Sequence, residues 1–275
     1  AGGDTHRVSD QDSLADANDV LWIRQCGQGV LVITSGSDDR LLLLDLESGK
    51  ETRRLTLSSP VAQNSQARPF LLDDRICYVD ERGFVSQIGV DDFALKGRIS
   101  SGQIRPNLFA PWKGMFLVLG YPGAALCDVA GNKILWRAEF KSSEQIVERA
   151  VIGEVLVVAT RQGSEANTLV GVNLSDGKRV FEERVEAEEE NDVLKLKVGV
   201  ALQDGAAFGY AITNTSTGMS VLRSFRLIVV DSTGKRKLDW SRATSGSAET
   251  MSLAAIDGYI VLTADRATIC FGAKE

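Results

Sequence analysis

The sequence predicts an all-β fold, a β-propeller of about six four-stranded blades, and three observations support this prediction. One strand–turn–strand pattern occurs six times along the chain, its strands are rich in valine and isoleucine, and Gly and Asp residues separate them. With 275 residues, 44% of them hydrophobic and 25% charged, the chain has an ordinary globular composition. It can therefore bury a substantial core without metal or disulfide support.

Each repeat begins with an apolar strand, a turn of two small or polar residues and a second, β-branched strand. The predicted turns are Gln28-Gly29, Asp74-Arg75, Lys113-Gly114, Gly153-Glu154, Asp204-Gly205 and Asp257-Gly258. Successive turns lie 46, 39, 40, 51 and 53 residues apart, counted between their second residues, which is the period of a propeller blade. The second strands are near-continuous apolar runs, typical of strands that are buried on both faces.

A third strand and a second turn follow in four of the copies. The strand ends in Asp or Asn, and Gly follows three or four residues later, in the pairs Asp45 and Gly49, Asp128 and Gly131, Asn173 and Gly177, and Asp231 and Gly234. Glycine supplies the positive φ of a tight turn, and the Asp or Asn side chain can accept hydrogen bonds from the turn's backbone amides.

The fourth strand carries a bulky residue soon after this turn, namely Trp136, Phe181 or Trp240. We interpret the tryptophans as packing between blades, because they recur at the same place in the repeat. The first copy has Arg53 instead, and the second has no Gly turn.

This combination of Asp, a small residue, Gly-Lys and Trp resembles the tryptophan-docking repeat of the pyrroloquinoline-quinone-like, or quinoprotein-like, propellers. It is also similar to that of the propeller lipoproteins of the outer-membrane β-barrel assembly machinery. The resemblance covers roughly residues 20–272. It implies a β-propeller and a periplasmic or extracellular location, since many proteins with such repeats are exported.

We expect one domain over residues 1–275, with blades near residues 20–61, 62–103, 104–144, 145–190, 191–246 and 247–272. The sixth copy contains only three strands, and an open sheet edge favours aggregation. We therefore expect residues 5–9 to add as its outer strand and close the ring. The alternative is that the chain is a piece of a larger propeller, with residues 1–19 disordered.

Composition argues against several functions. The net charge of −6 and the pI near 5.1, without a basic stripe, argue against a nucleic-acid partner. The sequence has no run of 18 apolar residues and therefore predicts no transmembrane helix. The single histidine, His6, argues against a Ser-His-Asp or Cys-His catalytic site, and the sequence offers no catalytic residue.

The four cysteines, Cys26, Cys77, Cys127 and Cys270, lie far apart in apolar stretches without a Cys-x-x-Cys pair. We expect them to be small buried hydrophobic residues, with a disulfide as the alternative. They do not predict a metal site.

Candidate partner-binding residues come from one loop and two tryptophans. Residues 213–220 form a long polar loop in the fifth blade, and such loops lie on a propeller rim where partners bind. The alternative interpretation of residues 213–220 is a variable surface loop. Residues 35–40 and 161–167 are the matching loops of the first and fourth blades. The candidates are Asn214, Thr215, Ser216 and Met219 in the loop, with Trp22 and Trp112 as further candidates for the channel rim.

The stretch 182–192 has seven carboxylates in eleven positions. It is either a solvated loop between the fourth and fifth blades or an attractor for calcium or a basic partner, although it lacks the spacing of a calcium loop.

The function that these patterns favour is a non-enzymatic scaffold that binds a protein partner through rim loops. The alternative is a propeller enzyme or sensor that binds a small molecule or sugar, with a divalent ion at the channel mouth. Neither calcium nor a quinone is excluded as a ligand, although the ligand set of a quinone enzyme has no residue-by-residue counterpart in this chain.

Overall fold

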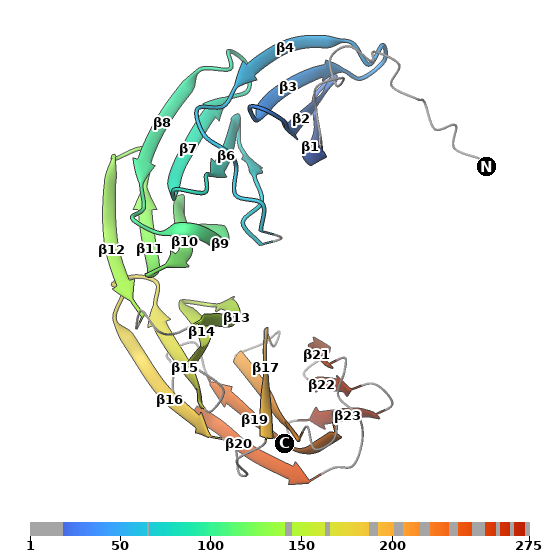
Figure 1. The fold of residues 1–275 in the computed structure, drawn as a ribbon, viewed down its shortest axis with the longest axis vertical. Coiled ribbons are helices and arrows are strands. Elements are labelled where there is room, and N and C mark those ends of the chain that lie inside the picture. The colour runs from blue at the N-terminus through green and yellow to red at the C-terminus, as the bar shows by residue number, and fades with distance from the viewer. Residues whose placement is uncertain are drawn as a thin grey trace, which may run out of the picture. The chain divides into compact units, whose positions relative to one another are not determined.

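The computed structural model consists of antiparallel β-sheets, as predicted (Figure 1). It describes residues 19–64, 66–140, 145–162, 166–186, 192–200, 206–214, 221–230, 236–243, 251–256, 259–264 and 267–272. All helical or extended elements of these residues are strands, β1 to β23. The chain divides into two compact units, residues 1–139 and 140–275.

The first unit contains three four-stranded sheets, each made of consecutive strands paired in chain order. The first sheet comprises β1 (Asp19–Cys26), β2 (Gly29–Ser35), β3 (Arg40–Asp45) and β4 (Glu51–Thr56). The second comprises β5 (Phe70–Leu72), β6 (Arg75–Val79), β7 (Phe84–Gly89) and β8 (Leu95–Ser100). The third comprises β9 (Ile104–Trp112), β10 (Met115–Tyr121), β11 (Gly123–Asp128) and β12 (Lys133–Glu139).

The second unit contains three more sheets of the same kind among its described residues. The fourth sheet comprises β13 (Gln145–Ile152), β14 (Val155–Gln162), β15 (Ala166–Asn173) and β16 (Arg179–Glu186). The fifth comprises β17 (Asp192–Val200), β18 (Ala206–Asn214), β19 (Val221–Val230) and β20 (Arg236–Ala243). The sixth has three described strands, β21 (Met251–Ile256), β22 (Tyr259–Ala264) and β23 (Ala267–Gly272). The predicted strand at residues 5–9 lies outside the described residues.

The tight turns after the first strands lie where predicted in two sheets and one residue earlier in two others. Lys113-Gly114, with φ of +48° and +77°, and Gly153-Glu154 are confirmed. In the first two sheets the turns are Gly27-Gln28 and Asp73-Asp74, so the predictions there were wrong by one residue. In each case the first residue of the observed turn has the positive φ, which is +57° at Gly27 and +53° at Asp73, and this turn sets the pairing register of the two strands. The turns predicted at 204–205 and 257–258 lie outside the described residues.

The second turns are capped by their Asp or Asn side chains, as predicted. Asp45 Oδ1 accepts hydrogen bonds from the Ser48 side-chain hydroxyl (2.7 Å) and backbone N–H (2.8 Å), which lower the Asp45 pKa. Asn173 Oδ1 accepts from the backbone N–H of Ser175 at 2.8 Å.

Glycine has a positive φ in two of these turns, +66° at Gly49 and +71° at Gly177. In the third turn Asn132 has it, at +48°, where we predicted Gly131. Asparagine tolerates the left-handed region, while the Gly131 N–H donates to Asp128 Oδ1 at 2.8 Å. The turn predicted at 231–234 lies outside the described residues.

Two apolar cores join the three sheets of the first unit. The first seam, between the first and second sheets, includes Leu31, Ile33, Leu41, Ile76, Tyr78 and Ile88. The second seam, between the second and third sheets, includes Cys77, Val79, Val85, Phe109, Phe116, Val118 and Cys127. Successive residues of β6 enter alternate seams, because side chains alternate across a strand. This arrangement confirms that the apolar run is buried on both faces.

A register shift marks the start of each fourth strand, and we define the docking position as the first paired residue after it. The docking residues are Arg53 opposite Leu43, Gly97 opposite Gln87, Trp136 opposite Leu126, Phe181 opposite Gly171 and Leu238 opposite Val229. Trp136 is 8% exposed. Trp240 pairs with Leu227 two residues beyond the docking position, so its prediction as an equivalent of Trp136 was wrong. The shift after Val229 places Leu238 there instead.

All four cysteines are free, and burial separates them into two groups. Cys77 and Cys127 are buried as predicted, and desolvation raises the pKa of each thiol to about 12. Cys26 is half-buried and packs partly against the first seam. Cys270 is exposed, contrary to the prediction, because β23 is an edge strand of the described part of its sheet.

Candidate functional site

The connections at one end of the first unit are joined by backbone hydrogen bonds into a continuous surface. We define the loop platform as residues 57–64, 80–83, 101–106 and 120–122. Glu81 N–H donates to the Pro60 carbonyl at 3.1 Å, and Arg105 N–H donates to the Glu81 carbonyl at 2.9 Å. Ser101 N–H donates to the Gly83 carbonyl at 2.9 Å. Loops from three sheets are thereby held at fixed positions relative to one another.

A buried carboxylate lies beneath the platform. Asp80 is fully buried, and its Oδ1 accepts hydrogen bonds of 2.9 Å from the backbone N–H groups of Arg82 and Phe84. Its Oδ2 accepts from the Ser59 hydroxyl and from Arg98 Nη2, the latter at 3.1 Å. Since a buried charge is tolerated only when it is paired and hydrogen-bonded, Asp80 fixes the connection to the second sheet.

A second buried carboxylate holds the same connection from the first sheet. Asp39 Oδ2 accepts a 2.7 Å hydrogen bond from Val61 N–H, and the Asp39 carbonyl accepts one of 2.8 Å from Leu57 N–H. Burial raises the pKa of Asp39, and the hydrogen bond from Val61 opposes that effect. Residues 57–61 are therefore held at both ends.

The third sheet is attached to the platform through a buried amide. Gln103 Oε1 accepts a 2.7 Å hydrogen bond from Gly123 N–H, and the Gln103 N–H donates to Ser101 Oγ at 3.1 Å. A Cβ at Gly83 would overlap the Gln103 carbonyl. Glycine is therefore required at Gly83, whose φ is +79°.

The outer surface of the platform has an apolar pair flanked by two arginines. Ile104 and Tyr121 are cross-strand neighbours and are 46% and 48% exposed. Arg105 and Arg82 are exposed, and their side chains make no hydrogen bond or ion pair to any residue that the structure describes. Arg105 has a φ of +49°, which is costly for a residue other than glycine and often marks a functional position.

The residues predicted from the sequence lie elsewhere. Trp22, in β1, is half-buried and packs against the first seam. Trp112 ends β9, at the opposite end of that strand from Ile104, and Lys113 Nζ lies 4.7 Å from its ring centroid. Asn214 is the last residue of β18, whereas Thr215, Ser216 and Met219 lie outside the described residues. The structure does not bring the two tryptophans together.

Sequence reasoning missed Ile104, Arg105 and Tyr121. The repeat describes strands and tight turns, whereas Ile104 and Arg105 directly follow the connection between two repeats and Tyr121 lies at the connection between β10 and β11. The one available signal was a run of polar and small residues, Ser100-Ser101-Gly102-Gln103, which is followed directly by the apolar Ile104.

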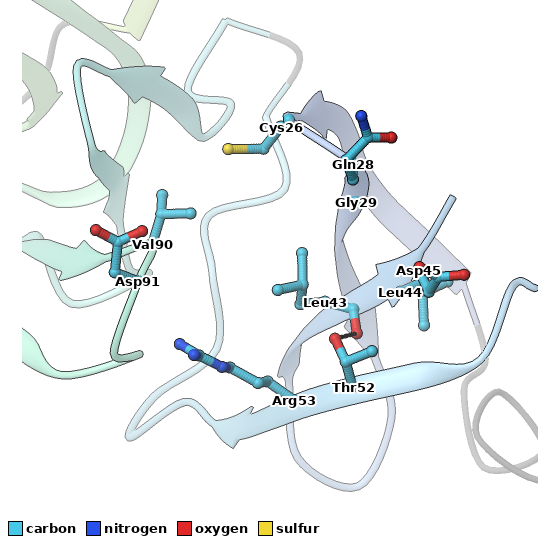
Figure 2. Close-up of a pocket in the computed structure, with 11 residues that line it drawn as sticks. Cys26, Gln28, Gly29, Leu43, Leu44, Asp45, Thr52, Arg53, Val90 and Asp91 are labelled. Atoms are coloured by element: carbon cyan, nitrogen blue, oxygen red, sulfur yellow. Dashed lines mark hydrogen bonds between the residues drawn. The ribbon is translucent and has the colours of Figure 1, made fainter. Parts of the chain in front are cut away.

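A pocket of about 470 Å³ opens at the other end of the first seam (Figure 2). Its lining residues are Cys26, Gly27, Gln28, Gly29, Leu43, Leu44, Asp45, Thr52, Arg53, Val90 and Asp91. Thr52 Oγ1 donates a 3.0 Å hydrogen bond to the Leu43 carbonyl within it. We refer to it as the seam pocket.

The described residues contain neither a candidate metal centre nor a helical membrane span. Among the described residues, no cluster of three or more His, Cys, Asp or Glu side chains could hold a metal ion. Within the same ranges, no helix is long and apolar enough to cross a membrane. Part of the acidic stretch 182–192 lies outside the described residues.

The solved structures that are similar to this chain include the following three, all at low identity. BamB from Moraxella catarrhalis is 13% identical, with 90% of this chain and 81% of that chain covered and a TM-score of 0.44. The WD40 domain of Toxoplasma gondii coronin is 11% identical, with coverages of 88% and 77% and a TM-score of 0.45. The β-propeller domain of Myceliophteria thermophila Cps50 (Swd1) is 10% identical, with coverages of 93% and 98% and a TM-score of 0.44.

The comparison with protein families confirms the resemblance that the repeats predicted. No curated protein matches the chain. The model of the family described as outer membrane protein assembly factor BamB matches residues 6–274. Because this match spans nearly the whole chain, the chain belongs to the BamB family of outer membrane protein assembly factors.

Proposed function

We propose that this chain is a non-enzymatic β-propeller scaffold that binds a protein partner and takes part in the assembly of outer-membrane proteins. The observation that carries the proposal is the family match over residues 6–274, since that family is described as an assembly factor. The proposed location is the periplasm, at the outer membrane, in agreement with the location that the repeats predicted.

The loop platform is the proposed partner-binding surface of the first unit. Ile104 and Tyr121 offer apolar contact area beside two guanidinium groups, and Tyr and Arg are enriched among the residues that dominate binding energy at interfaces. The hydrogen bonds beneath the surface support the proposal, because a preorganised surface loses little entropy on binding. The matching partner is a segment with an apolar side chain flanked by carboxylates.

The proposed scaffold is one closed propeller over residues 1–275. Six sheets of consecutive antiparallel strands support this proposal. Residues 5–9 would supply a fourth strand to the sixth sheet. The partner-binding role of the loop with Asn214, Thr215, Ser216 and Met219 and that of Trp22 and Trp112 stay predictions.

The test is site-specific photo-crosslinking in the source organism. A photoreactive phenylalanine analogue replaces Tyr121 on the platform, and in a matched control it replaces Leu135, which is 40% exposed on β12 and outside the platform. We expect position 121, but not 135, to crosslink to a component of the outer-membrane protein assembly machinery. The adduct is identified by mass spectrometry.

The outcomes separate the surface from the function. Adducts with assembly components from position 135 alone would show that the platform is the wrong surface. If neither position gives such an adduct, and deletion of the protein leaves outer-membrane protein levels unchanged, the proposed function is wrong. If the function holds, Ile104→Asp should weaken binding to the captured partner about 10-fold or more, because it removes an anchor residue.

A further inference from the structure

The docking position is filled in two of the sheets by large rings. In the third sheet it holds the buried indole of Trp136. In the fourth sheet the ring of Phe181 lies directly over Gly171, where even a Cβ would overlap it. The repeat thus builds a place for an aromatic ring beside the third strand.

The second sheet fills the same position from its neighbour. Gly97 has no side chain, and Val129 Cγ1 of the third sheet would lie 2.7 Å from a Cβ placed there. The docking position of one sheet therefore faces the turn after the third strand of the next sheet. For the first sheet, the facing turn is the one after β7 of the second sheet, which contains Val90, Asp91 and Phe93.

In the first sheet a non-aromatic docking residue, Arg53, lies at the wall of a pocket. Arg53 is exposed, and its Cζ lies 6.0 Å from the centroid of the Phe93 ring. The seam pocket lies between Arg53, its cross-strand partner Leu43, and the segment Val90-Asp91. Figure 2 shows Arg53 extending from β4 toward that segment. The pocket therefore lies beside the docking position that an aromatic residue occupies in the third and fourth sheets.

The charges of the pocket are of both signs. Neither Arg53 nor Asp91 forms an ion pair with any other residue of the described ranges, and both are exposed. Asp45, the other carboxylate of the lining, is already hydrogen-bonded by Ser48. The apolar surface between the charges comes from Leu43, Leu44 and the buried Val90.

We propose that the seam pocket binds a free aromatic amino acid. The ring occupies the vacated docking position against Leu43 and Val90, the carboxylate pairs with the Arg53 guanidinium, and the ammonium group pairs with Asp91. Arginine suits both a carboxylate and the face of a ring. This binding site is independent of the loop platform, which lies at the other end of the sheets.

Cysteine alkylation measures occupancy directly. Cys26 lines the pocket and is half-buried, whereas the exposed Cys270 lies in another sheet and serves as the internal control. We expect about 10 mM L-tryptophan to slow the reaction of Cys26 with N-ethylmaleimide several-fold, because ligand binding lowers the fraction of protein whose pocket is unoccupied. The reaction rate of Cys270 should not change. Leucine, which has no ring, and N-acetyltryptophanamide, which has no charges, should protect much less.

Three variants test the assignment of the groups. Arg53→Gln and Asp91→Asn each keep the cavity and should each reduce the protection by tryptophan. Arg53→Trp places an aromatic residue at the docking position, as in the third and fourth sheets. It should abolish protection and, because it fills the space, raise Tm by about 2–4 °C.

The proposal is overturned if tryptophan does not protect Cys26 in the wild-type protein. Equal protection by leucine would overturn the ring site, and equal protection by N-acetyltryptophanamide would overturn the pairing with Arg53 and Asp91. A lower Tm for Arg53→Trp, with tryptophan binding retained, would show that the pocket is not a vacated docking position.

Discussion

The two seams of the first unit have the same repeat architecture but different packing. In the second seam, Phe116 stacks with Phe109 at a centroid distance of 5.6 Å and with Phe70 at 5.9 Å. The core of the first seam is mostly aliphatic, with Tyr78 and Phe93 as its buried aromatic residues, and the seam pocket opens at its end. The docking positions differ as well, because Val129 Cγ1 lies over Gly97 whereas the seam pocket lies beside Arg53.

This difference shows how a repeat acquires a site. The backbone, the register shift and the second turn are common to these sheets, so stability is supplied by the repeat as a whole. The docking residue varies on this common frame, and in the first sheet it is a charged residue that lines a pocket.

The largest predicted effect is the loss of the aromatic stack in the second seam. Phe116 is fully buried, so Phe116→Ala should lower the free energy of unfolding by about 3–5 kcal/mol through lost burial and the cavity it leaves. Urea unfolding followed by tryptophan fluorescence measures the change. The matched change in the first seam is Leu41→Ala, at a fully buried aliphatic residue, with an expected cost of about 2–5 kcal/mol.

A cost below about 1 kcal/mol for Phe116→Ala would contradict the view that the second seam is tightly packed. A cost for Leu41→Ala that clearly exceeds it would reverse the comparison between the seams.

A smaller effect is expected at the docking positions themselves. Gly97→Ala places a Cβ 2.7 Å from Val129 Cγ1 and should cost about 1–3 kcal/mol, because a well-packed site resists added volume. Arg53→Ala, at the exposed equivalent in the first sheet, should change stability by less than about 0.5 kcal/mol. Equal effects in thermal unfolding would mean that the two positions are not packed differently.

The sequence predicted the strands, the tight turns and the burial of the second strands, because these follow from local pattern. The β6 run Ile76-Cys77-Tyr78-Val79 is apolar at each position, and the structure places its residues in alternate seams. The turn predictions failed by one residue where two overlapping pairs suited a turn, as with Gly27-Gln28 and Gln28-Gly29. Local chemistry limits the turn to a few residues, and the strand register selects among them.

The candidate surface could not be predicted in the same way. Ile104 and Tyr121 become neighbours only through the register of β9 and β10. Arg105 has a left-handed backbone conformation, but because it is not a glycine the sequence does not indicate this. The tryptophans Trp22 and Trp112 were chosen by residue type, which does not distinguish packing from binding. The exposure of an apolar residue depends on tertiary contacts that a single sequence does not contain.

The smallest predicted effect concerns pH and distinguishes the first seam from the second. Asp39 is 6% exposed, and burial raises its pKa above the ordinary value, with a contribution from Asp38. The groups nearby are Tyr78 and the paired Asp80 and Arg98. Between the ordinary and the raised pKa, the folded state binds more protons than the unfolded state. This contribution to the free energy of unfolding therefore falls as pH rises through that window.

Asp39→Asn cannot ionise but can still accept the hydrogen bond from Val61. The stability of the variant relative to the wild type should therefore increase as the pH rises from about 4 toward 7, by no more than a few tenths to about 1 kcal/mol. Urea unfolding at a series of pH values measures the difference, and Asp74→Asn, at an exposed carboxylate, is the control. A difference independent of pH would show that Asp39 keeps an ordinary pKa, and that the first seam holds its buried carboxylate without electrostatic cost.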